Sequence, residues 1–106
     1  MSRITTHILD AVQGSPAAGV ETVLARPGGP EIARGRTDAD GRLALGPDDL
    51  PDGDYQLRFD TGRYFAESGR ASFHPSVTIA FTVADAPHYH VPLLLSPYSY
   101  TTYRGS

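Results

Sequence analysis

The sequence predicts an all-β fold, a two-sheet antiparallel β-sandwich of about eight strands with one short helix near residues 61–69. The 106 residues include 11 Gly and 9 Pro, a composition that suits many short strands joined by turns. Short segments of alternating apolar and polar residues recur at spacings of roughly 8–12 residues, which is typical of sandwiches. The length is typical of one folded domain, so we expect residues 1–106 to form a single domain.

The first expected strand covers residues 5–9. Side chains alternate between the two faces of a strand, so Thr5, His7 and Leu9 share one face and Ile8 lies on the other.

Gly, Pro and Asp mark the boundaries of the later strands. We expect turns or loops at 10–17, 26–30, 38–41 and 46–54. The remaining strands are expected at about 19–25, 31–36, 42–45, 55–59, 77–83 and 88–96.

Alternation also assigns the inward side chains of these strands. Arg42 and Ala44 share the face opposite Leu43 and Leu45. The other side chains expected in the core are Tyr55, Leu57, Phe59, Val77, Ile79, Phe81 and Val83.

One segment predicts a helix of about two turns, at 61–69. Asp60 or Thr61 can cap its start, and Gly69 can end it.

Composition excludes several kinds of chemistry. The chain has no Cys, which removes disulfides, thiolate catalysis and cysteine metal sites, and its nine basic residues are all Arg. A net charge of -3 with scattered Arg residues argues against nucleic acid or an anionic membrane surface as a partner. No apolar run approaches the ~18 residues of a membrane span, and the first residues lack the apolar core of a secretory signal. The simplest expected location is the cytoplasm.

The histidines carry the remaining candidate chemistry. His88 and His90 are two residues apart on an expected strand, so both imidazoles lie on one face, a spacing that also suits zinc. Only Asp85 lies near them in sequence as a further ligand. His7 is a lone strand histidine, which is more often a solvated residue than a catalyst. The residues alone therefore indicate a sandwich with an imidazole-bearing face.

Segments at both ends of the chain resemble the transthyretin family. They are Thr6-His-Ile-Leu-Asp10 with Gly14-Ser-Pro-Ala17, and Tyr89-His-Val-Pro-Leu-Leu-Leu-Ser-Pro-Tyr-Ser-Tyr100. Thr37-Asp-Ala-Asp-Gly-Arg42 and Asp60-Thr-Gly-Arg-Tyr-Phe65 fit between them in the family's order. The resemblance covers essentially the whole chain and implies a transthyretin-like sandwich of eight strands with a short helix after the fifth.

Two branches of this family differ in the residues of the ligand channel. The thyroid-hormone carriers have Lys, Glu and Thr there, whereas the 5-hydroxyisourate hydrolases have His, Arg and His and end in Tyr-Arg-Gly-Ser. This chain has His7, Arg42 and His90 and ends in Tyr103-Arg-Gly-Ser106. The resemblance thus implies ring-opening hydrolysis of 5-hydroxyisourate, the product of urate oxidation, with no cofactor and no metal.

The resemblance also implies roles for these residues. His7, Arg42 and His90 are expected to be catalytic, and Arg42, Tyr103 and Ser106 to bind substrate. One histidine would deprotonate water, with a preference for His7, and the other would orient it or donate a proton. Arg42 would bind substrate and the developing oxyanion, Tyr103 would bound the pocket, and Ser106 with its terminal carboxylate would hydrogen-bond water or substrate.

A homotetramer is implied as well, a dimer of dimers with active sites between the dimers. His88 is expected to support the site from farther away. Two alternatives stay open: a transthyretin-type carrier without catalysis, and a zinc-dependent hydrolase that uses His7, His88 and His90.

Overall fold

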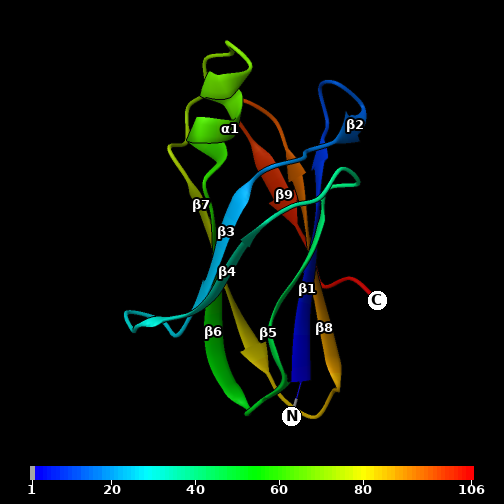
Figure 1. Cartoon of the computed structure of the whole chain (residues 1–106), viewed down its shortest axis with the longest axis vertical. Coiled ribbons are helices and arrows are strands. Elements are labelled where there is room, and N and C mark those ends of the chain that lie inside the picture. The colour runs from blue at the N-terminus through cyan, green and yellow to red at the C-terminus, as the bar shows by residue number, and fades with distance from the viewer. Residues whose placement is uncertain (1) are drawn as a thin grey trace.

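The computed structural model describes residues 2–106 as a sandwich of two β-sheets with one helix at an end (Figure 1). The elements in chain order are β1 (Ser2–Asp10), β2 (Ser15–Pro16), β3 (Glu21–Ala25), β4 (Glu31–Arg36), β5 (Arg42–Leu50), β6 (Gly53–Phe59), α1 (Thr61–Glu67), β7 (Val77–Val83), β8 (His88–Leu95) and β9 (Tyr100–Thr102).

One sheet has the order β2-β1-β8-β9, with β5 also paired to β1, and the other has the order β4-β3-β6-β7. Among residues 2–106 every strand pair is antiparallel except β1 and β8, which run parallel. The expected all-antiparallel pairing is therefore wrong at this one pair. Two parallel strands that pair need a long connection between them, and here the chain from β2 to β7, which includes the whole second sheet, connects β1 to β8. Alternation within one strand does not reveal the direction of its neighbour. As a result β1 lies between β5 and β8 (Figure 1).

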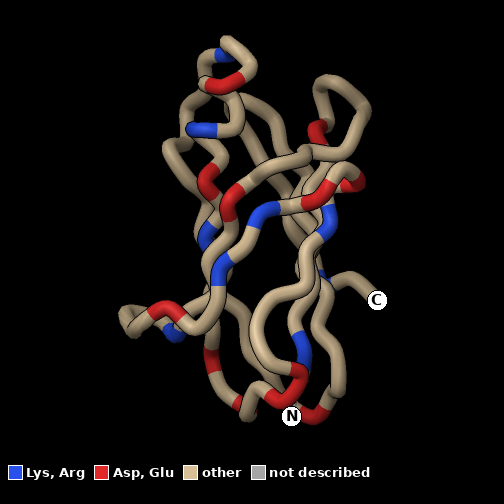
Figure 2. The backbone as a smooth tube through the Cα atoms, in the orientation of Figure 1, with Lys and Arg blue, Asp and Glu red and all other residues tan. Residues whose placement is uncertain are grey.

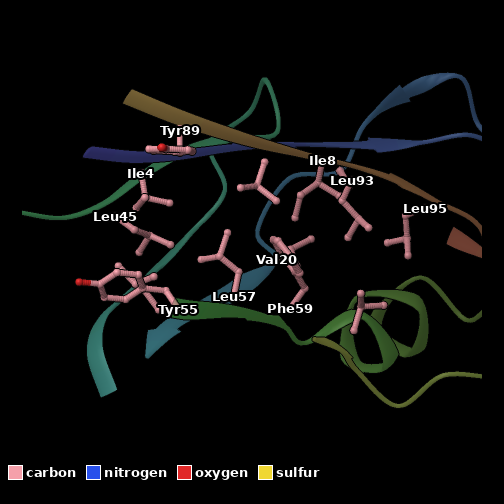
Figure 3. Packing of buried hydrophobic residues seen from close by; sticks show 14 of the residues in the cluster. Ile4, Ile8, Val20, Leu45, Tyr55, Leu57, Phe59, Tyr89, Leu93 and Leu95 are labelled. Carbon is pink, nitrogen blue, oxygen red and sulfur yellow. The ribbon is translucent and has the colours of Figure 1, made fainter. Parts of the chain in front are cut away.

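The hydrophobic core fills the space between the two sheets. Figure 3 shows Ile4 and Ile8 of β1 facing Leu57 and Phe59 of β6 across this space. The inward residues expected from alternation are confirmed, although Ile79 and Phe81 are only partly buried. Both line a hollow beside β8 and the tail, whereas Val77 and Val83 of the same strand are buried.

Several boundaries differ from those expected. β1 begins at Ser2, and β5 continues to Leu50 through the expected loop because Leu50 pairs with Ser2. β2 and β9 were not expected as strands. Their hydrogen-bond partners are β1 and β8, so they form through long-range pairing rather than through a local pattern.

The helix α1 matches the prediction, with Gly69 in the left-handed region at φ 70 just after its end. Asp60 occupies the N-cap position, but its side chain makes no capping hydrogen bond within the described chain, so that detail was wrong. Buried Phe65 and a hydrogen bond from Gly62 N–H to the Pro75 carbonyl hold the helix against the end of the sandwich.

Charged residues of both signs are interspersed along the chain (Figure 2). In the part of the chain that the structure describes, no helix is long and apolar enough to cross a membrane.

Candidate active site

The outer face of β1 brings the three expected catalytic residues together from three adjacent strands. His7 lies opposite Arg42 of β5, and Thr5 lies opposite His90 of β8. The inward residues of β1 are Ile4, Thr6 and Ile8, so Thr5 and His7 point away from the core, as alternation predicted. The parallel register of β1 and β8 thus places residues from opposite ends of the chain side by side.

The turn before β5 fixes where Arg42 begins its strand. Gly41 has φ 75, and a Cβ at this position would lie 2.3 Å from the Ile8 carbonyl oxygen, so only glycine fits. Ile8 N–H donates to the Gly41 carbonyl at 2.8 Å, and the Asp38 carboxylate accepts from the Arg42 N–H at 2.9 Å. The turn is therefore held directly against β1.

A hollow of about 330 Å³ lies over this face. Its lining includes Thr5, Asp38, Arg42, His88, His90 and Ser106. No carboxylate among residues 2–106 lies within ion-pair distance of the Arg42 guanidinium. A solvent-facing guanidinium with no carboxylate partner can accept an anionic or carbonyl-rich ligand in its planar fork.

His7 has a defined tautomer in its neutral form. Its Nε2 lies 2.9 Å from the Asp40 carbonyl oxygen, which can only accept a hydrogen bond, so Nε2 carries a proton. Nδ1 of the neutral ring is then unprotonated.

His90 is tied to Thr5 and has an unusual environment. Its Nδ1 lies 2.7 Å from Thr5 Oγ1, and Nε2 of His88 lies 2.6 Å from the same oxygen. Burial lowers the pKa of His90, and electrostatic interactions with His88, Arg42 and His7 lower it further. The ring is therefore held neutral at neutral pH and can accept a proton.

The last residues are anchored rather than frayed. Gly105 N–H donates to the His90 carbonyl at 2.8 Å, and the Arg104 guanidinium lies 4.6 Å from the centre of the Tyr89 ring. Thr102 Oγ1 donates to the Pro92 carbonyl at 2.8 Å. These contacts bring Ser106 to the hollow that Arg42 and His90 line.

Tyr103 lies elsewhere. It lines a second hollow, of about 610 Å³, between β7 and the tail, which His90 also borders. Within this chain, then, Arg42, His90 and Ser106 share one hollow, His7 adjoins it, and Tyr103 faces the other.

Sequence reasoning did not identify the partners of the histidines. Alternation places Thr5 on the correct face but assigns it no role, and nothing in the sequence signals the Asp40 carbonyl as a partner of His7. Among residues 2–106 no group of three or more histidine and acidic side chains is arranged to hold a metal ion.

Comparison with known proteins shows what this chain resembles. A family model described as the HIUase/Transthyretin family matches residues 4–105. The 5-hydroxyisourate hydrolase of Caulobacter vibrioides is 48% identical over 115 residues, which cover 100% of both chains. The structure of Klebsiella pneumoniae 5-hydroxyisourate hydrolase is similar with a TM-score of 0.92 and 41% identity, covering 100% of this chain and 94% of that one. The transthyretin of Sparus aurata is similar with a TM-score of 0.88 and 35% identity, covering 96% and 95%.

Proposed function

Because the chain belongs to the HIUase/Transthyretin family, we propose that it hydrolyses 5-hydroxyisourate. The reaction opens a cyclic amide C–N bond with water and gives 2-oxo-4-hydroxy-4-carboxy-5-ureidoimidazoline in urate catabolism. One observation supports this most directly: Arg42, His90 and Ser106, from β5, β8 and the tail, line one hollow. We also propose that residues 1–106 act as one domain.

The reaction has three chemical requirements. Water must lose a proton to become a nucleophile, the carbonyl oxygen must be stabilised as it gains charge, and the leaving nitrogen must gain a proton. Neutral imidazole suits both proton transfers, and a guanidinium suits the developing oxyanion.

His90 is the better candidate for the general base, in contrast to the sequence-based preference for His7. Its Nδ1 is occupied by Thr5, which leaves Nε2 as the ring atom available to a ligand. Its lowered pKa keeps the ring neutral and able to accept a proton. His7 lies beside Arg42, and its neutral ring, fixed by the Asp40 carbonyl, would orient water or substrate.

Arg42 and the end of the tail complete the proposed site. The Arg42 guanidinium, which has no carboxylate partner among residues 2–106, would bind the carbonyl and ring-nitrogen edge of the substrate and the oxyanion that develops there. Ser106 would hydrogen-bond the water or the substrate through its hydroxyl. Tyr103 lines the neighbouring hollow, so within one chain it would form the border of the site only from that side. In an assembly of several chains it could line the pocket itself.

A direct assay tests the activity. Urate and urate oxidase generate 5-hydroxyisourate, whose absorbance decay is followed with and without the protein. We expect clear acceleration, and His90→Gln should lower kcat by roughly 10²–10⁴, the usual contribution of a general base. No acceleration by the wild-type protein would refute the proposed activity.

The similarity to Sparus aurata transthyretin keeps a non-catalytic carrier as the alternative. A carrier would bind an aromatic ligand without consuming it, so ligand binding without turnover in the same assay would favour it. His7, Arg42 and His90 occupy the positions at which the carriers of this family have Lys, Glu and Thr, and this favours the hydrolase.

The assembly and location belong to the same proposal. Among residues 2–106, β7 and β9 are edge strands with one neighbour each, so their outer edges can pair with other copies. We propose a homotetramer with sites at its interfaces, in the cytoplasm. Light scattering after size exclusion should give about four times the chain mass of 11.4 kDa.

A further inference from the structure

Two imidazoles share one hydroxyl in the candidate site. Thr5 Oγ1 lies 2.6 Å from Nε2 of His88 and 2.7 Å from Nδ1 of His90, and all three side chains are half-buried. The β-sheet register explains the cluster, because Arg3 and Thr5 of β1 lie opposite His88 and His90 of β8. Adjacent strands therefore hold the three groups in place.

A hydroxyl has one proton to donate, so the two contacts are not independent. If Thr5 donates to His90, then His90 carries its proton on Nε2 and cannot accept one from water there. If Thr5 accepts from both rings, its own proton has no acceptor among the hydrogen bonds of the described residues. If Thr5 donates to His88 and accepts from His90, both protons shared among the three groups have acceptors and His90 Nε2 is free.

We propose that Thr5 and His88 are positioning residues that hold His90 with its proton on Nδ1 and its Nε2 free to act as the base. The chain of hydrogen bonds runs from His90 Nδ1–H to Thr5 Oγ1 and from Thr5 O–H to His88 Nε2. Orientation of a catalytic imidazole through its second nitrogen is a general device for fixing the reactive tautomer. The role in turnover rests on the proposed hydrolase function, whereas the tautomer does not.

The same chain can move positive charge away from His90. When His90 Nε2 takes a proton from water, its Nδ1 proton can pass to Thr5 Oγ1 as the Thr5 hydroxyl proton passes to His88 Nε2. His90 is then neutral with its proton on Nε2, ready for the leaving nitrogen, and His88 is an imidazolium. The proton count is conserved: as the His90 Nε2 proton passes to the leaving nitrogen, reverse transfer from His88 through Thr5 returns a proton to His90 Nδ1, so His90 stays neutral and the starting state is restored.

Nitrogen-15 NMR of the histidine rings tests the tautomer without substrate. At a pH where the rings are neutral, we expect the wild-type protein to carry a proton on Nδ1 of both His90 and His88. Thr5→Val, which keeps the shape but removes the hydroxyl, should convert His90 to a mixture of tautomers, and Thr5→Ser should restore the single form. A wild-type His90 or His88 with its proton on Nε2 would overturn the proposal.

Kinetics test the consequence for turnover. Thr5→Val should lower kcat by about 10–100-fold, less than loss of the base, while KM changes by less than about threefold. Thr5→Ser should recover most of this rate. His88→Gln, whose amide can still bond the Thr5 hydroxyl but cannot take a proton, should keep the His90 tautomer and still lose rate.

Thr6→Val is the matched control. Thr6 is the next residue of β1, and its hydroxyl also donates to β8, to the Val91 carbonyl at 2.6 Å, but on the core face. This variant should lose stability while the tautomer of His90 stays unchanged. If Thr6→Val disturbs the His90 tautomer as much as Thr5→Val does, the effect is merely structural and the proposal fails. Wild-type protein that shows the expected tautomer but no hydrolysis would refute the proposed function and not the hydrogen-bond chain.

Discussion

Gly105 sets how closely the carboxyl-terminal tail approaches His90. A Cβ on Gly105 would lie 2.6 Å from His90 Cδ2 and 3.1 Å from Pro92 Cγ, so an alanine forces the imidazole or the tail to move. A displacement of about 1 Å at a reacting group can cost on the order of 10² in rate. We therefore expect Gly105→Ala to lower kcat/KM at least about tenfold, measured in the absorbance assay, with little change in Tm because Gly105 lies outside the hydrophobic core.

Gly14→Ala is the control for this substitution. Gly14 has φ 66, and none of the described atoms would lie within 4 Å of an added Cβ, so the variant tests backbone strain far from the site. It should lose about 1 kcal/mol of stability and keep its activity. Activity of Gly105→Ala within twofold of wild type would mean that the tail does not position His90.

At this scale the sequence predicts which face a residue occupies but not what it contacts. Alternation placed Thr5 and His7 on the outer face of β1 correctly. The bond between Thr5 and His90 joins residues 85 positions apart, and it exists because β1 and β8 pair in parallel. Strand order and direction depend on the whole fold, so a local pattern cannot predict that contact.

At the scale of elements, a buried ion pair joins the end of β1 to the segment after α1. Asp10 is fully buried and accepts hydrogen bonds from Arg70 Nη2 at 2.6 Å and from the Tyr64 hydroxyl at 2.8 Å. Burial by itself raises the pKa of Asp10, but the bonds from Arg70, the Gln13 N–H and Tyr64 outweigh it and lower the pKa overall. The cluster ties the helix to the sheet that carries the candidate site.

We expect Asp10→Asn to lower the free energy of unfolding by about 3 kcal/mol at pH 7, because Arg70 loses a buried partner. The folded pKa lies below the ordinary value of 3.8, so the stabilisation by the carboxylate is complete above that value and is lost as pH falls through the folded pKa. The difference between wild type and variant should thus shrink at pH values below about 3.8, as urea denaturation at several pH values would show.

Glu31→Gln is the control on an exposed pair. Glu31 bonds Arg34 at 2.5 Å on the surface of β4, where water screens the pair, so Glu31→Gln should lower stability much less than Asp10→Asn. Equal losses for the two variants at pH 7 would mean that burial adds nothing to the Asp10 pair.

Helices and strands that a local sequence pattern marks could be predicted. Strands that form only because they pair with a distant strand could not. Alternation located the strand at 77–83, and Gly69 located the end of α1. The extension of β5 to Leu50 and the strand β9 depend on partners in β1 and β8. Gly46 and Pro47 indicate a loop because both residue types disfavour β-strands. The pairing of Leu50 with Ser2 overrides that local conformational preference.

For the whole molecule, the surface along the edge strand β7 and the carboxyl-terminal tail is the candidate interface with other copies of the chain. The hollow of about 610 Å³ lies there, and Tyr103, which lines it, is 57% exposed. Exposed aromatic residues beside unpaired strand edges are typical of surfaces that other chains cover. The sequence supported the tetramer only through family resemblance, because a single chain's alternation does not distinguish an interface from an open surface.

Ala80→Arg tests whether a second copy covers this edge. Ala80 is exposed on β7 and lines the hollow, so an arginine there would have to lose its water in an interface between copies, which is costly for an unpaired charge. We expect the mass in solution to fall from four chains to fewer, with a parallel fall in specific activity if the sites need neighbouring subunits. Ala66→Arg makes the same change at an exposed position of α1, away from the hollow, and should keep both the mass and the activity. A fully active four-chain Ala80→Arg protein would show that subunits do not meet at β7, and the interface would then have to be sought on the outer face of β1, where His7 and Arg42 lie.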